Sequence, residues 1–136
     1  MTDRLSASAR SKNMSLIKNK HTKPEMVVRK IVFSLGFRYR LHDRNLPGTP
    51  DLIFPRKRKL IFVNGCFWHM HENCVKFKLP ASNREFWTLK LQGNRYRDDA
   101  NLQKLTDLGW RVLIVWECEL RDKDELREKL VSFLDD

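Results

Sequence analysis

The chain has 136 residues, 41% of them hydrophobic, which suits one compact domain with a core and is too short for two. Its 27 Lys and Arg residues outnumber 17 Asp and Glu residues, and the net charge of +10 favours a polyanionic partner such as nucleic acid. No run of about 18 apolar residues predicts a membrane span. Residues 1–14 lack the apolar segment of a secretory signal, so we expect a cytoplasmic protein.

The first half of the chain predicts an arm, a helix and three strands. Residues 1–21 are polar and basic and are predicted to form an arm, with a single domain over 22–136. Thr22 and Glu25 form a capping-box pattern, and apolar residues then recur at helical spacing until Gly36 offers a C-cap.

The predicted strands follow this first helix. Residues 37–42 alternate in polarity and suit a strand. Residues 51–54 and 60–63 predict a β-hairpin around the basic tip Arg56–Lys59.

The second half predicts a loop, a long helix, a strand and a last helix. Residues 66–80 show no periodicity, and Ser82 starts a second capping-box pattern for a helix predicted to reach Leu108. Residues 110–116 are almost continuously apolar, which predicts a central strand, and a helix follows over 123–134. This order of elements predicts an α/β fold with a mixed sheet.

The three cysteines and one histidine predict a metal centre. In a reducing compartment cysteines are more often metal ligands or buried thiols than disulfides. Cys66, His71 and Cys74 lie close together, and Cys118 follows the last predicted strand. Three thiolates and one imidazole make a closed tetrahedral set for Zn²⁺, so the ion is expected to be structural and to hold the irregular loop on the sheet. His69 competes for the fourth position, and three unrelated buried thiols are the alternative.

The acidic candidate for catalysis is Asp51, which follows a proline and opens a strand. A carboxylate there can hold Mg²⁺ for phosphodiester hydrolysis, although most Pro-Asp pairs belong to turns. The hairpin is similar to the PD…(D/E)xK pattern of restriction-type nucleases, but no acid-x-Lys follows at Val63 and Asn64. His69 is therefore the candidate for proton transfer, with zinc ligation or loop packing as alternatives. Glu25 either only caps its helix or also presents its carboxylate toward the site.

Five longer motifs carry a resemblance to a known family: ARSKNM, PGTPD, NGCFWH, P-A-x-x-x-E-F-W and GWRVLIVWEC. From about residue 9 to residue 120, the chain closely resembles the Vsr-type very short patch repair endonucleases. The resemblance implies a restriction-endonuclease-like fold of the PD-(D/E)xK superfamily, with helices flanking a mixed central sheet and a structural zinc loop. It implies Mg²⁺-dependent nicking of double-stranded DNA 5′ to the thymine of a T:G mismatch, which arises when 5-methylcytosine deaminates. It also implies a monomeric, nucleoid-associated bacterial enzyme, linked in function to a cytosine-5 DNA methyltransferase.

The resemblance also implies roles for single residues. It places Mg²⁺ on the carboxylate of Asp51 and the carbonyl of Val63, a catalytic histidine at His69 and an assisting acid at Glu25, while zinc falls on the four ligands that the spacing predicts. Asn64 stands where the best-known members have a histidine, and its amide cannot exchange a proton near neutral pH.

Aromatic and polar residues predict the DNA contacts. Phe67 and Trp68 either plug the core or, as the resemblance implies, wedge into the base stack while Met14 enters from the opposite groove. One face of the long helix carries a stripe, read as recognition surface or as plain solvated surface, formed by Trp87, Lys90, Asn94 and Asp98. The neighbouring face is expected to pack inward through Phe86, Leu89, Gly93 and Tyr96. Expected phosphate contacts are Arg10, Lys12 and the basic tip.

Two other functions fit parts of this pattern. A zinc-containing DNA-binding module without catalysis explains the charge, the aromatic residues and the cysteines, but it leaves Asp51 without a role. A related nuclease could instead act on a different target, such as ordinary duplex ends. The mismatch and the metal dependence separate these possibilities.

Overall fold

The fold is taken from a computed structural model, which describes residues 21–75 and 77–135. The helices are α2 (Lys23–Ser34), α3 (Arg84–Asp107) and α4 (Lys123–Leu134), and two short 3-10 helices are η2 (Pro55–Lys57) and η3 (Glu117–Arg121). The strands are β1 (Arg40–Leu41), β2 (Leu52–Phe54), β3 (Lys59–Asn64) and β4 (Arg111–Trp116). This order confirms the predicted α/β class and all three predicted helices. In the described part of the chain, no helix is long and apolar enough to cross a membrane.

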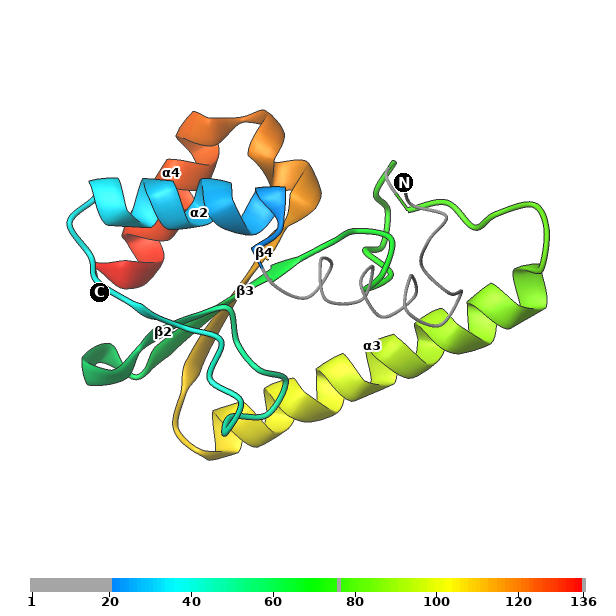
Figure 1. Cartoon of the computed structure of the whole chain (residues 1–136), viewed down its shortest axis with the longest axis horizontal. Helices are drawn as coiled ribbons and strands as arrows, with labels where there is room; N and C mark the ends of the chain where they lie inside the picture. Colours follow the sequence, from blue (N-terminus) through cyan, green and yellow to red (C-terminus); the bar gives the residue numbers. More distant parts are fainter. Residues whose placement is uncertain (1–20, 76, 136) are drawn as a thin grey trace, which may run out of the picture.

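A four-stranded mixed sheet in the order β1-β2-β3-β4 divides the molecule into two layers of core. β2 pairs antiparallel with both β1 and β3, and β4 runs parallel to β3. Because successive strand residues face opposite sides, Leu52 and Ile61 pack against α2 and α4, whereas Ile53 and Leu60 pack with Leu105 of α3. Figure 1 shows α2 and α4 on one side of the sheet and α3 on the other.

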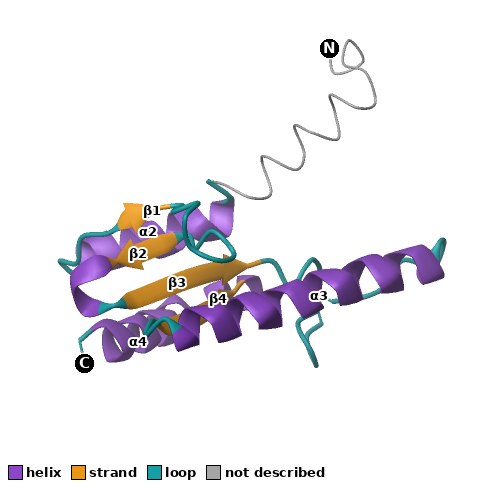
Figure 2. Cartoon of the chain, turned by 90° about the horizontal axis from the view of Figure 1, so that it is seen from below, coloured by secondary structure: helices purple, strands orange, loops and turns teal. Residues whose placement is uncertain are grey.

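The long helix α3 continues past the end of the sheet (Figures 1 and 2). Its C-terminal part supplies Leu105 to the core, while its N-terminal part lies alongside the irregular segment that follows β3. That segment, residues 65–83, contains no helix or strand among the residues described. The predicted loop of 66–80 is therefore confirmed, and α3 provides the surface on which it rests.

The position of β4 in the sheet corrects the prediction of a central strand. Among residues 21–75 and 77–135, β4 pairs only with β3 and forms an edge. Its faces are nevertheless covered, since Val115 belongs to the core under α2 and α4 and Val112 packs on the core under α3. The continuous apolar sequence of β4 therefore indicated that both of its faces are covered. It did not indicate how many strands pair with β4.

The two capping-box predictions differ in outcome, since at α2 the Thr22 half is confirmed while Glu25 Oε1 accepts the backbone N–H of His21. Thr22 caps α2, because its Oγ1 accepts the N–H of Glu25 at 3.3 Å. At α3 the N-cap is Asn83, not Ser82, and it makes no side-chain cap hydrogen bond. Asn83 has φ of 56°, a left-handed conformation that asparagine tolerates better than most residues, so the chain enters this helix through a turn. The first predicted strand also shortens, from 37–42 to Arg40–Leu41.

The basic tip Arg56–Lys59 was predicted to contact phosphate. For Lys59 that prediction is wrong. Lys59 is only 2% exposed, and its Nζ donates to the carbonyl of Phe133 at 2.6 Å. That carbonyl lies in the last turn of α4, where the helix itself offers no partner. Lys59 therefore ties the start of β3 to the end of α4, and only Arg56, Lys57 and Arg58 remain at the surface.

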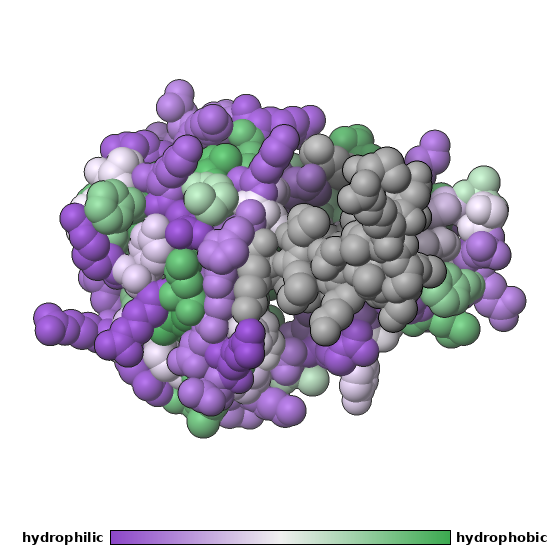
Figure 3. Space-filling model, in the orientation of Figure 1, coloured by the Kyte–Doolittle hydropathy of each residue, from purple (hydrophilic) through white to green (hydrophobic). Residues whose placement is uncertain are grey.

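The prediction that an apolar face of α3 packs inward is also wrong. Phe86, Leu89 and Tyr96 are 59%, 66% and 77% exposed. Hydrophobic surface is visible at the end of the molecule where α3 begins (Figure 3). Of the polar stripe, Trp87, Asn94 and Asp98 contact the loop instead, and this orientation brings functional side chains to the site.

Candidate active site and metal centre

A cleft of about 570 Å³ opens at the C-terminal end of β3. Its walls come from the start of α2, the turn before β2, the end of β3, the irregular loop and the middle of α3. Six of the predicted site residues line it together: Glu25, Asp51, Val63, Asn64, His69 and Asp98. Residues far apart in sequence therefore converge on one place, as a catalytic site requires.

Asp51 lies at the inner wall of this cleft, with its side chain 13% exposed. One carboxylate oxygen, Oδ2, accepts the N–H of Val63 at 2.7 Å. Burial raises the pKa of Asp51 to about 7, and the hydrogen bond from Val63 opposes this while the neighbouring Glu25 adds to it. Two carboxylates held together away from water repel one another, and a divalent cation between them would relieve that repulsion.

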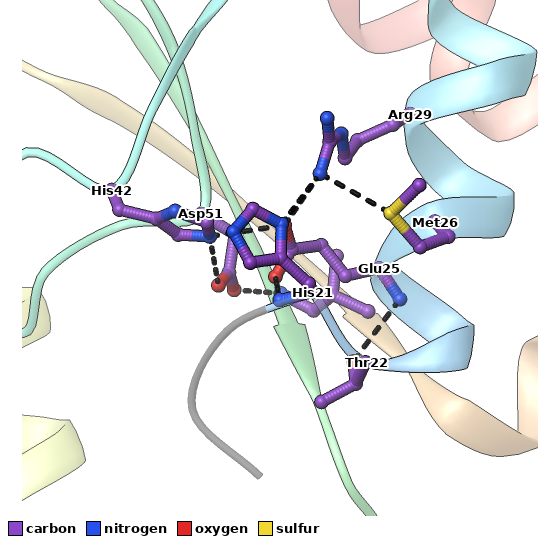
Figure 4. Close-up of polar contacts among 8 residues, drawn as sticks. His21, Thr22, Glu25, Met26, Arg29, His42 and Asp51 are labelled. Carbon is purple, nitrogen blue, oxygen red and sulfur yellow. Dashed lines mark hydrogen bonds and ion pairs between the residues drawn. The ribbon is translucent and has the colours of Figure 1, made fainter. Parts of the chain in front are cut away.

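Glu25 is the second buried carboxylate, 1% exposed at the start of α2. Its Oε1 accepts the backbone N–H of His21 at 3.1 Å, and its Oε2 lies 3.0 Å from Nε2 of His42 and 3.5 Å from a guanidinium nitrogen of Arg29 (Figure 4). The residue thus has both roles that its sequence position left open. Its backbone N–H completes the helix cap, and its carboxylate faces Asp51.

Sequence reasoning missed His42. Its Nε2 lies 3.0 Å from Glu25 Oε2 and 3.9 Å from Asp51 Oδ1 (Figure 4). The signal was present in the hairpin, because the N–H of His42 donates to the carbonyl of Asp51 at 3.3 Å and the two residues are cross-strand neighbours. A register drawn through the β1–β2 pair places them opposite one another.

The acid paired with His69 is not Glu25, the assisting acid that the resemblance implies. Its Nδ1 lies 2.5 Å from Oδ2 of Asp98 on α3, and both side chains are about one-third exposed. A carboxylate at Nδ1 fixes the ring orientation and favours the proton on that nitrogen, which leaves Nε2 available as a base. The carboxylate partner of His69 is therefore Asp98. This residue belongs to the polar stripe of α3, for which plain solvated surface was the alternative interpretation.

The four predicted zinc ligands also come together: Cys66, His71, Cys74 and Cys118. Their ligand atoms lie within 4.8 Å of one another, and Nδ1 of His71 is 3.5 Å from Sγ of Cys118. The parallel register explains why distant cysteines meet, since Asn64 pairs with Trp116 and each cysteine lies two residues further along.

The surroundings of this cysteine cluster favour His71 over His69 as the fourth ligand. The ring of His71 stacks on Trp116 at 4.0 Å with an angle of 6°, while His69 is paired with Asp98. Burial raises the pKa of the Cys66 thiol to about 12 and raises that of Cys118 as well. A bound cation reverses this, because a coordinated thiol is deprotonated. Three converging thiols and an imidazole are a donor set that fits zinc.

Aromatic side chains from the loop and from α3 pack together next to these residues in the sequence. Phe67, Trp68 and Trp87 form a triangle with ring centroids 5.1–5.9 Å apart, and each is only partly buried. Asn94 donates to the carbonyl of Trp68 at 3.3 Å, so the stripe on α3 holds this part of the loop. Lys90 lies on the same helix and is exposed. The predicted contacts Arg10, Lys12 and Met14 lie outside the described residues.

These features define a class of enzyme. A basic α/β protein has buried paired carboxylates and a histidine–carboxylate pair in one open cleft, beside a closed cysteine cluster and half-exposed aromatic rings. This combination of features is typical of a nuclease that acts on DNA.

Comparisons with known proteins give the family. The model of the family described as DNA mismatch endonuclease Vsr matches residues 2–76. The chain is 46% identical over 135 residues to the type II nicking enzyme V.XorIIP of Xanthomonas oryzae, covering 99% of this chain and 98% of that one. It is 44% identical to the type II nicking enzyme V.NmeAIP of Neisseria meningitidis, covering 96% and 92%. It is 41% identical to the DNA mismatch endonuclease Vsr of Escherichia coli, covering 97% and 84%.

The chain belongs to the Vsr family of DNA mismatch endonucleases. It is therefore a DNA endonuclease, a hydrolase that nicks its substrate. Membership implies a restriction-endonuclease-like fold, with which the four-stranded mixed sheet and its flanking helices agree.

Proposed function

We propose that this enzyme nicks one strand of duplex DNA 5′ to the thymine of a T:G mismatch, by Mg²⁺-dependent hydrolysis that leaves 5′-phosphate and 3′-hydroxyl ends. The observation that carries the proposal is the shared cleft, which both the paired carboxylates and the histidine–carboxylate pair line. One pair suits a divalent ion and the other suits proton transfer. Neither pair alone would distinguish a nuclease from a DNA-binding module.

Asp51 and the carbonyl of Val63 would hold the Mg²⁺ ion, in a cleft wide enough to admit a phosphate. The fit rests on Asp51 and Glu25, two oxygen ligands that lie together and have little solvent around them. When bound, the ion supplies positive charge to the phosphate and lowers the pKa of water. Asp51 is held for this by the N–H of Val63, which fixes one of its oxygens.

His69 would act as general base or general acid, positioned by Asp98. The contact through Nδ1 stabilises the charged ring after it takes a proton, as a carboxylate does in hydrolytic triads. Asn64, 7% exposed and lining the same cleft, would orient a water molecule or phosphate by hydrogen bonding. Proton transfer would therefore depend on the imidazole of His69 alone.

The cysteine cluster would hold a structural zinc ion. Four protein ligands leave no open position for substrate, which separates this site from catalytic zinc sites. Its role would be to fix the loop that carries both His69 and the aromatic triangle, since that loop has no helix or strand of its own.

The aromatic triangle would recognise the mismatch. Phe67 and Trp68 would enter the base stack from one groove and Met14 from the other, and a T:G pair opens more readily than a Watson–Crick pair. The arm over residues 1–21, through Arg10 and Lys12, would bind phosphate, as would the exposed lysine of the stripe. The protein would act as a monomer on the chromosome, in the cytoplasm, after a cytosine-5 methyltransferase has created the sites at risk.

A nicking assay on matched duplexes tests this function. Three duplexes that differ only in one pair, T:G, A:T or G:C, are incubated with the protein, with and without Mg²⁺. We expect a single-strand nick beside the T:G pair only, and only with Mg²⁺. Mismatch binding without a nick would establish the DNA-binding module instead. Equal cleavage of all three duplexes would establish a nuclease with a different target.

A further inference from the structure

His42 is a buried polar residue for which the proposed mechanism has no role. Its side chain is only 9% exposed. Its Nε2 points toward the carboxylates of Glu25 and Asp51 (Figure 4). One atom from each of these three side chains lies within 4.8 Å of the others.

The backbone holds His42 in this place. Its N–H donates to the carbonyl of Asp51 at 3.3 Å, so the two residues are fixed opposite one another at the end of the β1–β2 pair. Its φ of 50° lies in the left-handed region, which costs free energy for a residue with a side chain. Here that conformation leaves the imidazole directed at the two carboxylates.

We propose that Nε2 of His42, with Glu25 and Asp51, is a direct ligand of the divalent ion in the cleft. The inference rests on the proposed function, because it concerns the same ion. One atom each from His42, Glu25 and Asp51 lies within 4.8 Å of the others, a spread that a single ion with bonds of ~2.1 Å to oxygen could bridge. Nε2 lies 3.0 Å from Glu25 Oε2 and 3.9 Å from Asp51 Oδ1, and an ion bound by all three would replace the direct His42–Glu25 contact.

The ligand set has a consequence for the choice of metal. Mg²⁺ prefers oxygen ligands alone, whereas imidazole nitrogen strengthens binding of first-row transition ions. A site of two carboxylates and one imidazole should therefore bind Mn²⁺ more tightly than Mg²⁺, and the difference should come from His42.

Spectroscopy of bound Mn²⁺ tests this inference without relying on activity. The full chain, with its cysteine cluster loaded with zinc, is titrated with Mn²⁺ in the absence of DNA, and bound ion is measured by electron paramagnetic resonance. Electron spin-echo modulation then reports whether a ¹⁴N nucleus is coordinated. We expect a ¹⁴N signal in the wild type that disappears in His42→Gln.

Affinities provide the second measurement. In His42→Gln, Mn²⁺ affinity should fall by about tenfold or more, a scale that loss of even an outer partner of a metal site can reach. Mg²⁺ affinity, measured by competition, should fall much less. The matched control is His21→Gln, because His21 packs edge-on against His42 at 5.1 Å but its Nδ1 contacts Arg29. That variant should keep both the ¹⁴N signal and the affinity.

The outcomes separate this inference from the proposed function. Mn²⁺ bound without a ¹⁴N signal in the wild type, or a signal that persists in His42→Gln, would overturn the role of His42. If Asp51→Asn still abolishes Mn²⁺ binding and nicking in that case, the proposed nuclease site stands. Absence of Mn²⁺ and Mg²⁺ binding to the wild type would remove both.

Discussion

The acidic cleft and the cysteine cluster are two candidate metal sites that each take a histidine from the same irregular loop, and they differ in ligand type and in openness. His69 turns to a carboxylate on α3, while His71, two residues later, turns to Cys118 and stacks on Trp116. The cleft offers oxygen and nitrogen atoms beside open space, whereas the cluster offers three sulfur atoms and one nitrogen that converge on one centre. The contrast indicates chemistry at the first site and support of the fold at the second.

This division of labour can be tested by removing each site in turn. Changes in the cysteine cluster should reduce stability and take activity with it. Changes in the cleft should remove activity and leave stability intact, or even increase it, because buried carboxylates are costly.

The largest effect is expected from loss of the structural metal. Cys118→Ser, or a chelator that removes zinc, should lower the melting temperature by more than ~10 °C, because structural zinc contributes several kcal/mol or more to folding. His69→Gln is the matched control, since it changes the same loop two residues away from His71 and should leave the melting temperature unchanged. A chelated protein that melts like the wild type would remove the structural role.

Asp51→Asn should have the next largest effect, and on nicking alone. Loss of the charged oxygen that holds the ion should reduce the nicking rate by about 10⁴-fold or more, which corresponds to over ~5 kcal/mol of transition-state stabilisation. Binding to the T:G duplex, measured by fluorescence anisotropy, should be retained. Nicking at the wild-type rate would show that the ion is held elsewhere.

The same substitution should stabilise the protein in a manner that depends on pH. The pKa of Asp51 rises from 3.8 to about 7 on folding, so the folded state favours the protonated carboxyl. Below pH ~4 the carboxyl is protonated in both the folded and the unfolded state and does not destabilise the fold. As the pH rises from there toward 7, the unfolded state loses its proton first, and the free energy of unfolding falls. Without added divalent ions, Asp51→Asn should gain up to ~4 kcal/mol over the wild type at pH 8, and less than half of that at pH 5. Urea denaturation at both pH values measures this, and a gain that does not change with pH would contradict the assignment.

Asp98→Asn should have the smallest of these effects, because Asp98 acts through His69. The amide cannot stabilise a charged imidazole as a carboxylate does, so the nicking rate should fall by about 10²-fold while DNA binding is unchanged. The pH profile of nicking should also shift, which a merely structural role would not produce. The control is Asp99→Asn on the next residue, which is exposed and forms an ion pair with Arg95. Equal losses in both variants would place the effect in the helix.

Local patterns predicted much of this molecule because they act over short distances. The capping residues and apolar spacing of α2 specified that helix, and cysteine spacing selected the cluster, which the parallel β3–β4 register then brings together. Membership of the family was also readable from contiguous motifs, and the comparisons confirm it.

The directions in which side chains of the irregular loop point could not be predicted in the same way. Between residues 65 and 83 no repeating backbone relates one side chain to the next, so only packing decided that His69 meets Asp98 rather than Glu25. Packing likewise buried Lys59 against the end of α4 and left Phe86 in solvent. Each depends on a partner distant in sequence.

The sequence alone determined which chemical groups this protein possesses and the elements that carry most of them, since residue type, spacing and short-range periodicity are local properties. Tertiary structure decided which groups meet. The approach of His42 to Asp51 and Glu25 follows from strand register and from the docking of α2, and the free energies that fix these contacts arise between segments that no local pattern relates.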